Sequence, residues 1–579
     1  MAAEPQLDAA GYPRKGRVIR FLVAVLILGS PVFPQSRSSE QARLTAARRA
    51  FDAGHWAEAA TLARGTADQS PELDFLSGLA LARMEKWSQA KLAFETGLRK
   101  APKDPRFLVE LAGTAYKQED FRTATERLRK ALDLYPQDAY SREFLATIYF
   151  QQGNLEAALK YWNPEDKPRL RSVAFAPSLQ LKESLRNRAL AFNAPQILTG
   201  DALLVTQSRL DNLGVFSNQR IELHPSESGN YDLTLHLAER NGWGDSKVAG
   251  IVSLLSGLPY ATIYPEFYNL GRDAVNLTSL ARWDSEKRRV SLALSLPLYG
   301  DPRLRLRLYA DARNENWNLE RTFLGAGVPL TDLNVRRMAA GVEVHSIVNR
   351  HWSWSTGAEI ANRNFRNLSG HTSPAERPFF SGATSVAGRL GVVRTLVRVP
   401  ERRFTVDSSA EARAGREFAD ALGPFAGFRG SLRAHWFPRA KGDDFEMQAQ
   451  IRAGATAGKA SLDELFELGI ERDNDLWLRG HAGTLAGRKG AAPLGRRFFL
   501  ANWEVDKNIY QNGFFTVKLG PFLDSGAVAD SSGLFGSQRW LWDTGAQCQV
   551  RVLGSLTVVL SYGRDLRGGR NVFYGTVLR

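Results

Sequence analysis

Two neighbouring stretches, residues 289–299 (RVSLALSLPLY) and 303–313 (RLRLRLYADAR), decide the fold class of the larger part of the chain. Their apolar side chains recur at every second position, which is the period of a β-strand. In the second stretch, four arginines and one aspartate alternate with this apolar series. A strand with charges along one face cannot bury both faces in a dry core. We therefore expect one face to meet lipid and the other to meet a wet lumen or another charged layer.

Alternating patterns of this kind continue from Trp243 to the end of the chain, for example in residues 515–523, 555–562 and 571–578. At roughly 20 residues for a strand and its connection, this region holds about sixteen strands, enough for an antiparallel transmembrane β-barrel over residues 243–579. Alternation alone leaves a second possibility open, a soluble all-β domain with exposed arginines.

Composition excludes several classes of protein. The chain has 579 residues, 44% of them hydrophobic and 24% charged, which is typical of folded domains. Apolar runs of about 20 residues are absent after the N-terminus, so a helical multi-pass membrane protein is excluded. The single cysteine, Cys548, leaves no intrachain disulfide and no cysteine-based metal cluster. The net charge of +15 alone does not indicate nucleic acid, and we expect no nucleic-acid partner.

The first 36 residues have the layout of a signal peptide. Arg14, Lys15, Arg17 and Arg20 precede an apolar stretch over residues 21–28, and turn-forming residues follow. The apolar stretch is too short for an ordinary spanning helix. The sequence therefore predicts export, with a short N-terminal membrane anchor as the alternative.

Residues 40–165 form a helical repeat. Pro71, Pro102 and Pro136 are spaced by 31 and 34 residues, and a period near 34 is typical of tetratricopeptide repeats. The small residues expected at the helix contacts are Gly78, Ala90, Ala112, Ala124, Ala146 and Ala158. This pattern resembles a tetratricopeptide array, an all-α solenoid whose concave side binds peptides. We expect it to dock accessory proteins, with a structural spacer as the alternative.

Residues 168–241 read as a small α+β domain with the order strand, helix, helix, strand, strand. Gly214 ends the second helix, and Leu233, Leu235 and Leu237 share one face of the last strand. This order, with the stretch RLDNLGVFSNQRIEL, resembles a POTRA domain, the periplasmic module of outer-membrane assembly and secretion proteins.

Several motifs of the β region resemble the BamA/TamA outer-membrane assembly superfamily, also called the bacterial surface antigen barrel. The stretch EFYNLGRDAVNLTSLARWD resembles its first strands. The stretch LDELFELGIERDNDLWLRGHAG resembles its inward-folded loop, whose tip here is Leu478, Arg479, Gly480 and His481. The resemblance further implies that Arg479 pairs with acidic residues of the barrel wall, and Glu504 and Asp524 occupy the matching positions. The alternative is that Arg479 is one more solvated arginine of the lumen.

No catalytic motif accompanies these features. Metalloprotease, phosphate-loop and nucleophile-elbow patterns are absent, and the eight histidines show no metal-ligand spacing. We therefore expect no enzyme, no cofactor and no metal. The resemblance implies a protein of the bacterial outer membrane, with its N-terminal domains in the periplasm, that inserts or translocates client polypeptides. The alternative is a surface-anchored scaffold in which the barrel only anchors the helical array.

Overall fold

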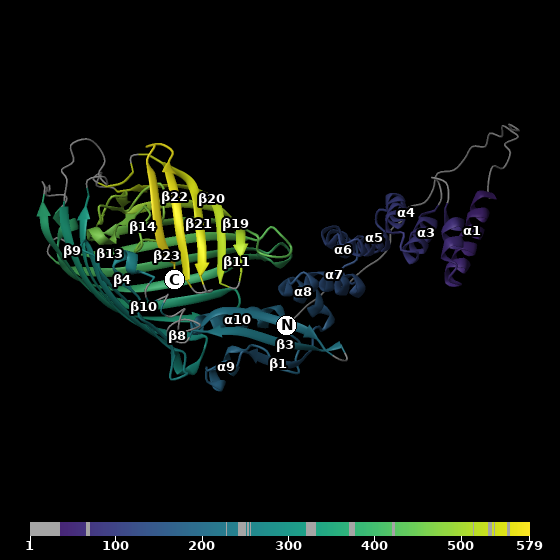
Figure 1. Ribbon diagram of the computed structural model, residues 1–579, viewed down its shortest axis with the longest axis horizontal. Coiled ribbons are helices and arrows are strands. Elements are labelled where there is room, and N and C mark those ends of the chain that lie inside the picture. Colours follow the sequence, from purple (N-terminus) through teal and green to yellow (C-terminus); the bar gives the residue numbers. More distant parts are fainter. Residues whose placement is uncertain are drawn as a thin grey trace, which may run out of the picture. The chain divides into compact units, whose positions relative to one another are not determined.

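The computed structural model describes residues 35–64, 70–226, 229–240, 251, 254, 256–319, 332–369, 377–419, 423–512, 514–530, 535–537, 539–552 and 556–578 (Figure 1). The chain divides into two compact units, residues 1–127 and 128–579. No described helix is both long and apolar enough to cross a membrane. The predicted signal peptide lies outside the described residues except for its last two, where the first helix begins.

Helices alone make up the described part of the first unit. They are α1 (Gln35–Asp52), α2 (Trp56–Ala63), α3 (Pro71–Arg83), α4 (Trp87–Lys100), α5 (Pro105–Lys117) and the start of α6 (Phe121–Leu134). Proline opens α3 and α5, a position where its missing N–H costs nothing. Asp104 caps α5 by accepting a hydrogen bond from the Arg106 backbone N–H at 3.0 Å. A further hydrogen bond, from the Arg106 side chain, lowers the pKa of the Asp104 carboxyl.

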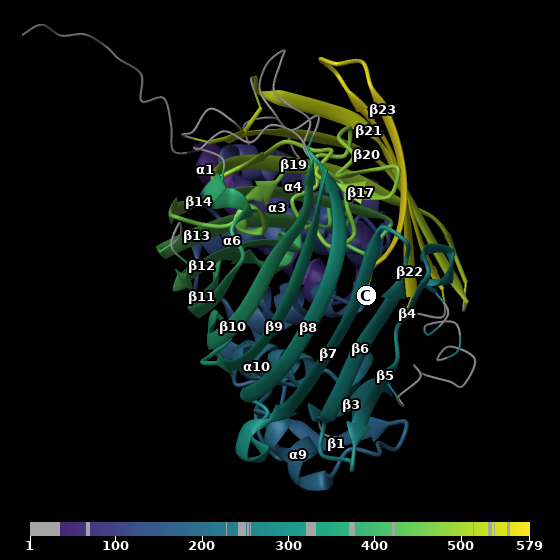
Figure 2. The same cartoon turned by 90° about the vertical axis from the view of Figure 1, so that its left-hand side faces the viewer.

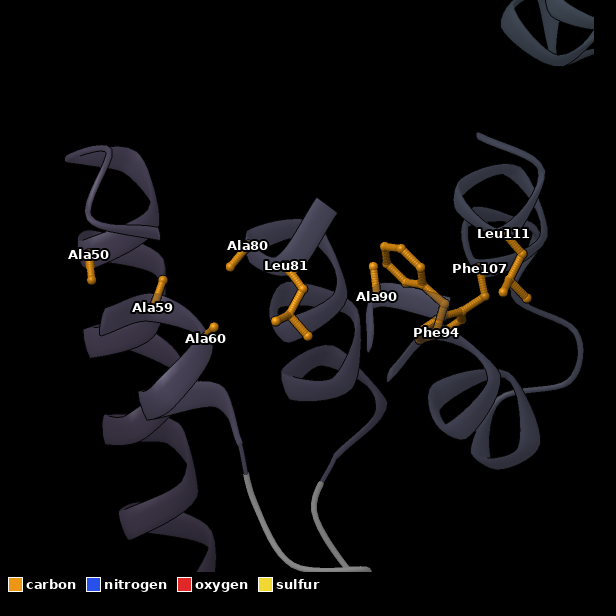
Figure 3. Packing of buried hydrophobic residues seen from close by; sticks show 9 residues of the cluster. All are labelled: Ala50, Ala59, Ala60, Ala80, Leu81, Ala90, Phe94, Phe107 and Leu111. Carbon is orange, nitrogen blue, oxygen red and sulfur yellow. The ribbon is translucent and has the colours of Figure 1, made fainter. Parts of the chain in front are cut away.

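Small residues lie where these helices touch. A Cβ at Gly78 of α3 would come within 2.4 Å of the Phe94 ring of α4, so only glycine fits there. Phe94 and Phe107 are fully buried in the core between successive helix pairs (Figure 3). The predicted alanines Ala90, Ala112 and Ala124 have 0% exposed surface, as do Ala146 and Ala158 in the helices that follow.

Replacing Ala112 with leucine is expected to destabilise the helical array by about 1–3 kcal/mol, because the added carbons have no space. Circular dichroism at 222 nm should show the helices melting earlier, while the heat resistance of the sheet on detergent gels stays unchanged. Gly113→Ala is the matched control, since a Cβ at this neighbouring position meets nothing within 4 Å. Simultaneous loss of helices and sheet in Ala112→Leu would contradict the independence of the two.

The second unit begins with a helix pair and a small α/β module. The pair is α7 (Ala139–Gln151) and α8 (Leu155–Trp162). The module contains β1 (Leu170–Ala176), α9 (Glu183–Ala189), α10 (Gly200–Leu213), β2 (Phe216–Pro225) and β3 (Tyr231–Glu239), in the predicted order. Its sheet has the order β1-β3-β2, with β1 parallel and β2 antiparallel to the central strand. Gly214 ends α10 in a left-handed conformation, with φ of +68°.

One large antiparallel, barrel-like sheet forms the rest of the unit, and Figure 2 shows β5 to β10 side by side. Its first half contains β4 (Thr262–Ile263), β5 (Glu266–Leu270), β6 (Val275–Trp283), β7 (Lys287–Pro297), β8 (Leu304–Asn318), β9 (Asp332–Ile347), β10 (Trp352–Ser369) and β11 (Ala383–Val399). Its second half contains β12 (Phe404–Phe418), β13 (Pro424–Trp436), β14 (Phe445–Gly458), β19 (Arg497–Gln511), β20 (Phe515–Ala529), β21 (Leu541–Val552), β22 (Leu556–Asp565) and β23 (Asn571–Leu578).

The ring of neighbours comprises 18 labelled segments, against about sixteen strands expected. Two of them, β4 and β5, oppose the same strand, β6, and so form one broken strand. Two more, β16 (Thr484–Leu485) and β17 (Arg488–Lys489), belong to the loop between β14 and β19. Fifteen wall strands therefore remain among the described residues. The order returns from β23 to β4, where the Tyr260 hydroxyl donates to the Gly575 carbonyl at 2.8 Å.

Helices of the second unit contact turns at one end of this sheet. The Tyr161 hydroxyl donates to Glu401 in the turn between β11 and β12 at 2.9 Å, and Lys160 of α8 forms an ion pair with the same carboxylate. Burial raises the pKa of Glu401, but the bond from Lys160 and its charge outweigh this effect and the pKa is lowered. From α10, the Asn212 amide donates to the Pro302 carbonyl at 2.9 Å. Two helices, α8 and α10, thus contact two different turns at this end of the sheet.

Candidate functional site: the inward loop and its tip

The connection between β14 and β19, residues 459–496, is the inward loop. Its ion pairs reach wall strands on several sides of the ring: Asp473 pairs with Arg282 of β6 and Arg289 of β7, Glu471 with Lys287 of β7, and Asp463 and Glu464 with Arg363 of β10. Its tip contacts β19 to β22. A segment that reaches such widely separated strands lies inside the ring.

Arg479 at the tip lies against both predicted acidic partners. Its Nε and Nη2 donate to the two oxygens of Asp524 at 2.9 and 2.7 Å, and its Nη1 donates to Glu504 at 2.8 Å. Nη1 also donates to Gln547 at 2.9 Å, and the guanidinium carbon lies 3.7 Å from the centroid of the Phe522 ring. Arg479 is only 3% exposed, so this is a buried charge with its donors engaged. A solvated lumen arginine is therefore not what the structure contains.

The other three tip residues anchor the loop on both sides of Arg479. Leu478 is fully buried in an apolar cluster that includes Phe498 and Leu500 of β19. The Gly480 N–H donates to Asp543 at 2.5 Å, and a Cβ at Gly480 would come within 2.6 Å of that carboxylate carbon. The loop therefore needs glycine at this position to approach the wall.

His481, the last tip residue, lies between two aspartates. Its Nδ1 is 3.0 Å from Asp543, and its Nε2 is 3.7 Å from Asp565. Sequence reasoning singled out neither aspartate, because the two lie far apart along the chain from each other and from the tip. Sequence offers no signal for them, because their place beside the tip partner Asp524 depends on the register of successive strands.

A second group of buried charges was also missed. Arg363 has no exposed side-chain surface, and its Nε lies 2.7 Å from Asp463. It also contacts Glu464 and lies 3.3 Å from Glu417 of β12. The acid-rich sequence of residues 463–475 could have suggested that this loop forms ion pairs with arginines of the wall strands.

Comparisons with known proteins agree in part with these observations. A family model described as tetratricopeptide repeat matches residues 75–121, which confirms such repeats in α3 to α5. A family of unknown function, DUF6584, matches residues 114–263. The human protein IFIT1 homolog B is 33% identical over 103 residues, which cover 16% of this chain. The chain spans 22% of the length of that relative.

Among solved structures, BamA from Haemophilus ducreyi lacking POTRA domains 1–3 matches with a TM-score of 0.42 and 13% identity, over 71% of this chain and 84% of that one. CdiB from Escherichia coli matches with 0.44 and 13%, over 71% and 75%. CdiB from Acinetobacter baumannii matches with 0.41 and 14%, over 71% and 73%.

Proposed function

We propose that this chain is an outer-membrane barrel protein that inserts or translocates other polypeptides, with its helical array and α/β module in the periplasm. In this proposal its partners are outer-membrane lipid, client polypeptides, and accessory proteins that bind the helical array. This function requires no nucleotide or catalytic centre, because it consists of pairing with a client strand and passage of the client polypeptide through the sheet.

The observation that carries the membrane assignment is the outward face of the sheet. Every wall strand from β6 to β14 and from β19 to β23 exposes at least one large apolar side chain. They are Trp283, Val290, Leu308, Met338, Ile360, Leu390, Phe418, Phe428, Ile451, Trp503, Leu519, Trp542, Leu560 and Phe573. Monomeric soluble proteins rarely expose apolar surface on this scale, and a lipid bilayer is the environment that covers it.

Neighbouring positions on the same strands point the other way and are charged. Glu359, beside exposed Ile360, is 4% exposed and accepts a hydrogen bond from Arg389 at 2.9 Å. Arg389 in turn precedes exposed Leu390. Apolar outside and charged inside at a period of two is the arrangement of a membrane barrel with a polar lumen. The inward loop is held in that lumen by ion pairs.

The junction of β23 and β4 supports insertion or translocation over simple anchoring. Strands here are short, with two residues in β4, five in β5 and eight in β23, whereas β10 has 18 and β11 has 17. Since each residue of a ladder contributes its hydrogen bonds to the pairing, this junction should open more easily than the long pair of β10 and β11. A client strand could pair there while the far wall stays intact.

The array and the module supply earlier contacts in this proposal. In the module, which we propose to be a POTRA domain, β1 and β2 are the edge strands of the sheet. An edge strand offers unpaired N–H and C=O groups that can extend a client strand. The helical array would deliver partners to these edges. In the alternative scaffold function, the array binds a partner and the sheet contacts lipid only.

A photocrosslinking amino acid at Phe573 tests the proposal in intact cells. Phe573 on β23 is 73% exposed beside the junction, and Ile360 on the far wall is 53% exposed and serves as the matched control. Pulse-labelled outer-membrane polypeptides are expected to crosslink at residue 573 and not at residue 360. Lipid alone at both positions would favour the scaffold, and recovery of the protein in the soluble fraction would refute both functions.

A further inference from the structure

Three aspartates form a row across neighbouring strands. Asp524 of β20 lies directly opposite Asp543 of β21, which lies directly opposite Asp565 of β22. All three are buried, with exposed fractions of 0, 0 and 6%. Like charges directly opposite each other destabilise a sheet, and burial in a medium of low dielectric increases this cost. Positive charge beside the row would offset this cost.

Among the described residues, an arginine supplies positive charge at the Asp524 end of the row. Arg479 neutralises Asp524 but shares its guanidinium with Glu504. Within the described residues, His481 is the one basic side chain that forms an ion-pair contact with Asp543 or Asp565. These two carboxylates therefore lack the arginine pairing that Asp524 has.

One carboxylate oxygen of this pair is also left without a partner. Asp543 Oδ2 accepts from the Gly480 N–H and faces His481, whereas Asp543 Oδ1 is buried and has no hydrogen-bond partner among the described residues. Asp565 uses one oxygen for the Arg567 N–H at 2.9 Å and keeps the other toward His481. A buried carboxylate oxygen without a partner is costly, and a cation would satisfy it.

Two glycines let the backbone approach these carboxylates closely. A Cβ at Gly480 would lie 2.7 Å from Asp543 Oδ1, the oxygen that has no partner. A Cβ at Gly568 would lie 2.3 Å from the oxygen of Asp565 that faces His481. A side chain at either position would collide with these oxygens.

We propose that His481, Asp543 and Asp565 bind one divalent transition-metal cation of the Zn²⁺ class. One nitrogen of the histidine and one oxygen of each aspartate all lie within 4.8 Å of one another. One imidazole and two carboxylates are a ligand set that zinc accepts, with a water at the remaining position of a tetrahedral site. The metal joins the loop tip to β21 and β22, as Arg479 joins it to β19 and β20. This site does not depend on the function proposed above.

Metal content of the full-length, tag-free protein in detergent tests the site. A chelator first removes bound metal from the protein, which is then dialysed against Zn²⁺. Mass spectrometry measures the metal that remains bound. Wild type is expected to retain one Zn²⁺ per chain more than Asp543→Asn and His481→Gln. His435→Gln is the matched control, because His435 also faces a carboxylate, Glu446 at 2.8 Å, but is not part of the cluster. It should retain as much metal as wild type.

Co²⁺ binding to wild type provides a second measurement, which needs no comparison with a variant. Wild type loaded with Co²⁺ is expected to show visible absorption bands of a nitrogen- and oxygen-ligated ion, and Zn²⁺ should displace them. If unboiled His481→Gln migrates on detergent gels as unboiled wild type does, its sheet is assembled. Loss of the Co²⁺ bands in that variant then reports the loss of a metal ligand. Equal metal content in wild type and both ligand variants, or no Co²⁺ bands in wild type, would overturn the proposal.

Discussion

Replacing Arg479 with alanine is expected to reduce the amount of assembled, heat-resistant sheet severely, with a loss of about 3–5 kcal/mol. The change leaves the buried Asp524 carboxylate, which is 0% exposed, without its two guanidinium hydrogen bonds. Asp524 would then keep the Arg479 backbone N–H and Asn502, which are uncharged donors. Comparison of boiled and unboiled samples on detergent gels, with the total protein level as reference, measures the effect.

Variants of the pair separate its charge from its geometry. Arg479→Lys should recover only part of the assembled sheet, because one ammonium cannot donate to Asp524 and Glu504 along the forked directions that arginine uses. Asp524→Asn should act in the same direction as Arg479→Ala, and the double variant should lose less than the sum of the two. Arg307→Ala is the control, since its pair with Glu343 is long, at 3.6 Å, and half exposed. Wild-type levels of assembled Arg479→Ala would refute this role of the tip.

Arg363→Ala is expected to have an effect of similar size, again about 3–5 kcal/mol. The guanidinium has no exposed surface and faces three carboxylates, those of Glu417, Asp463 and Glu464. Without it, three acidic groups remain together in the interior. Detergent-gel mobility measures the loss of assembled sheet, and protease digestion of intact cells shows whether the inward loop becomes cleavable.

Arg366 offers a matched control on the same strand. It lies three residues further along β10 and is exposed, so Arg366→Ala should leave mobility and protease resistance as in wild type. If Arg363→Ala also behaves like wild type, the ion pairs between the loop and β10 do not hold the loop in place. Partial rescue of Arg363→Ala by Glu417→Gln is expected, because removing one of the three charges relieves part of the repulsion.

Local sequence patterns predicted a large part of this structure because they report local physics. A period of two placed Leu308 outward, at 42% exposure, and Arg289, Arg313 and Asp311 inward in ion pairs with one another. A period near 34 identified Ala90, Ala124 and Ala158, which have no exposed surface because helices meet there. The tip and its two acidic partners were implied by the resemblance of their motifs to a known family, not by periodicity.

What the sequence determined by itself is therefore the two kinds of secondary structure and the face that residues of the periodic segments occupy. Only the tertiary structure decided which charges meet across the ring. Strand register sets Asp543 opposite Asp565, and the path of the inward loop brings Asp463 to Arg363, a hundred residues away in the chain. Periodicity assigns a side chain to a face but not to a neighbour on another strand, because that neighbour depends on the pairing of all the strands between them.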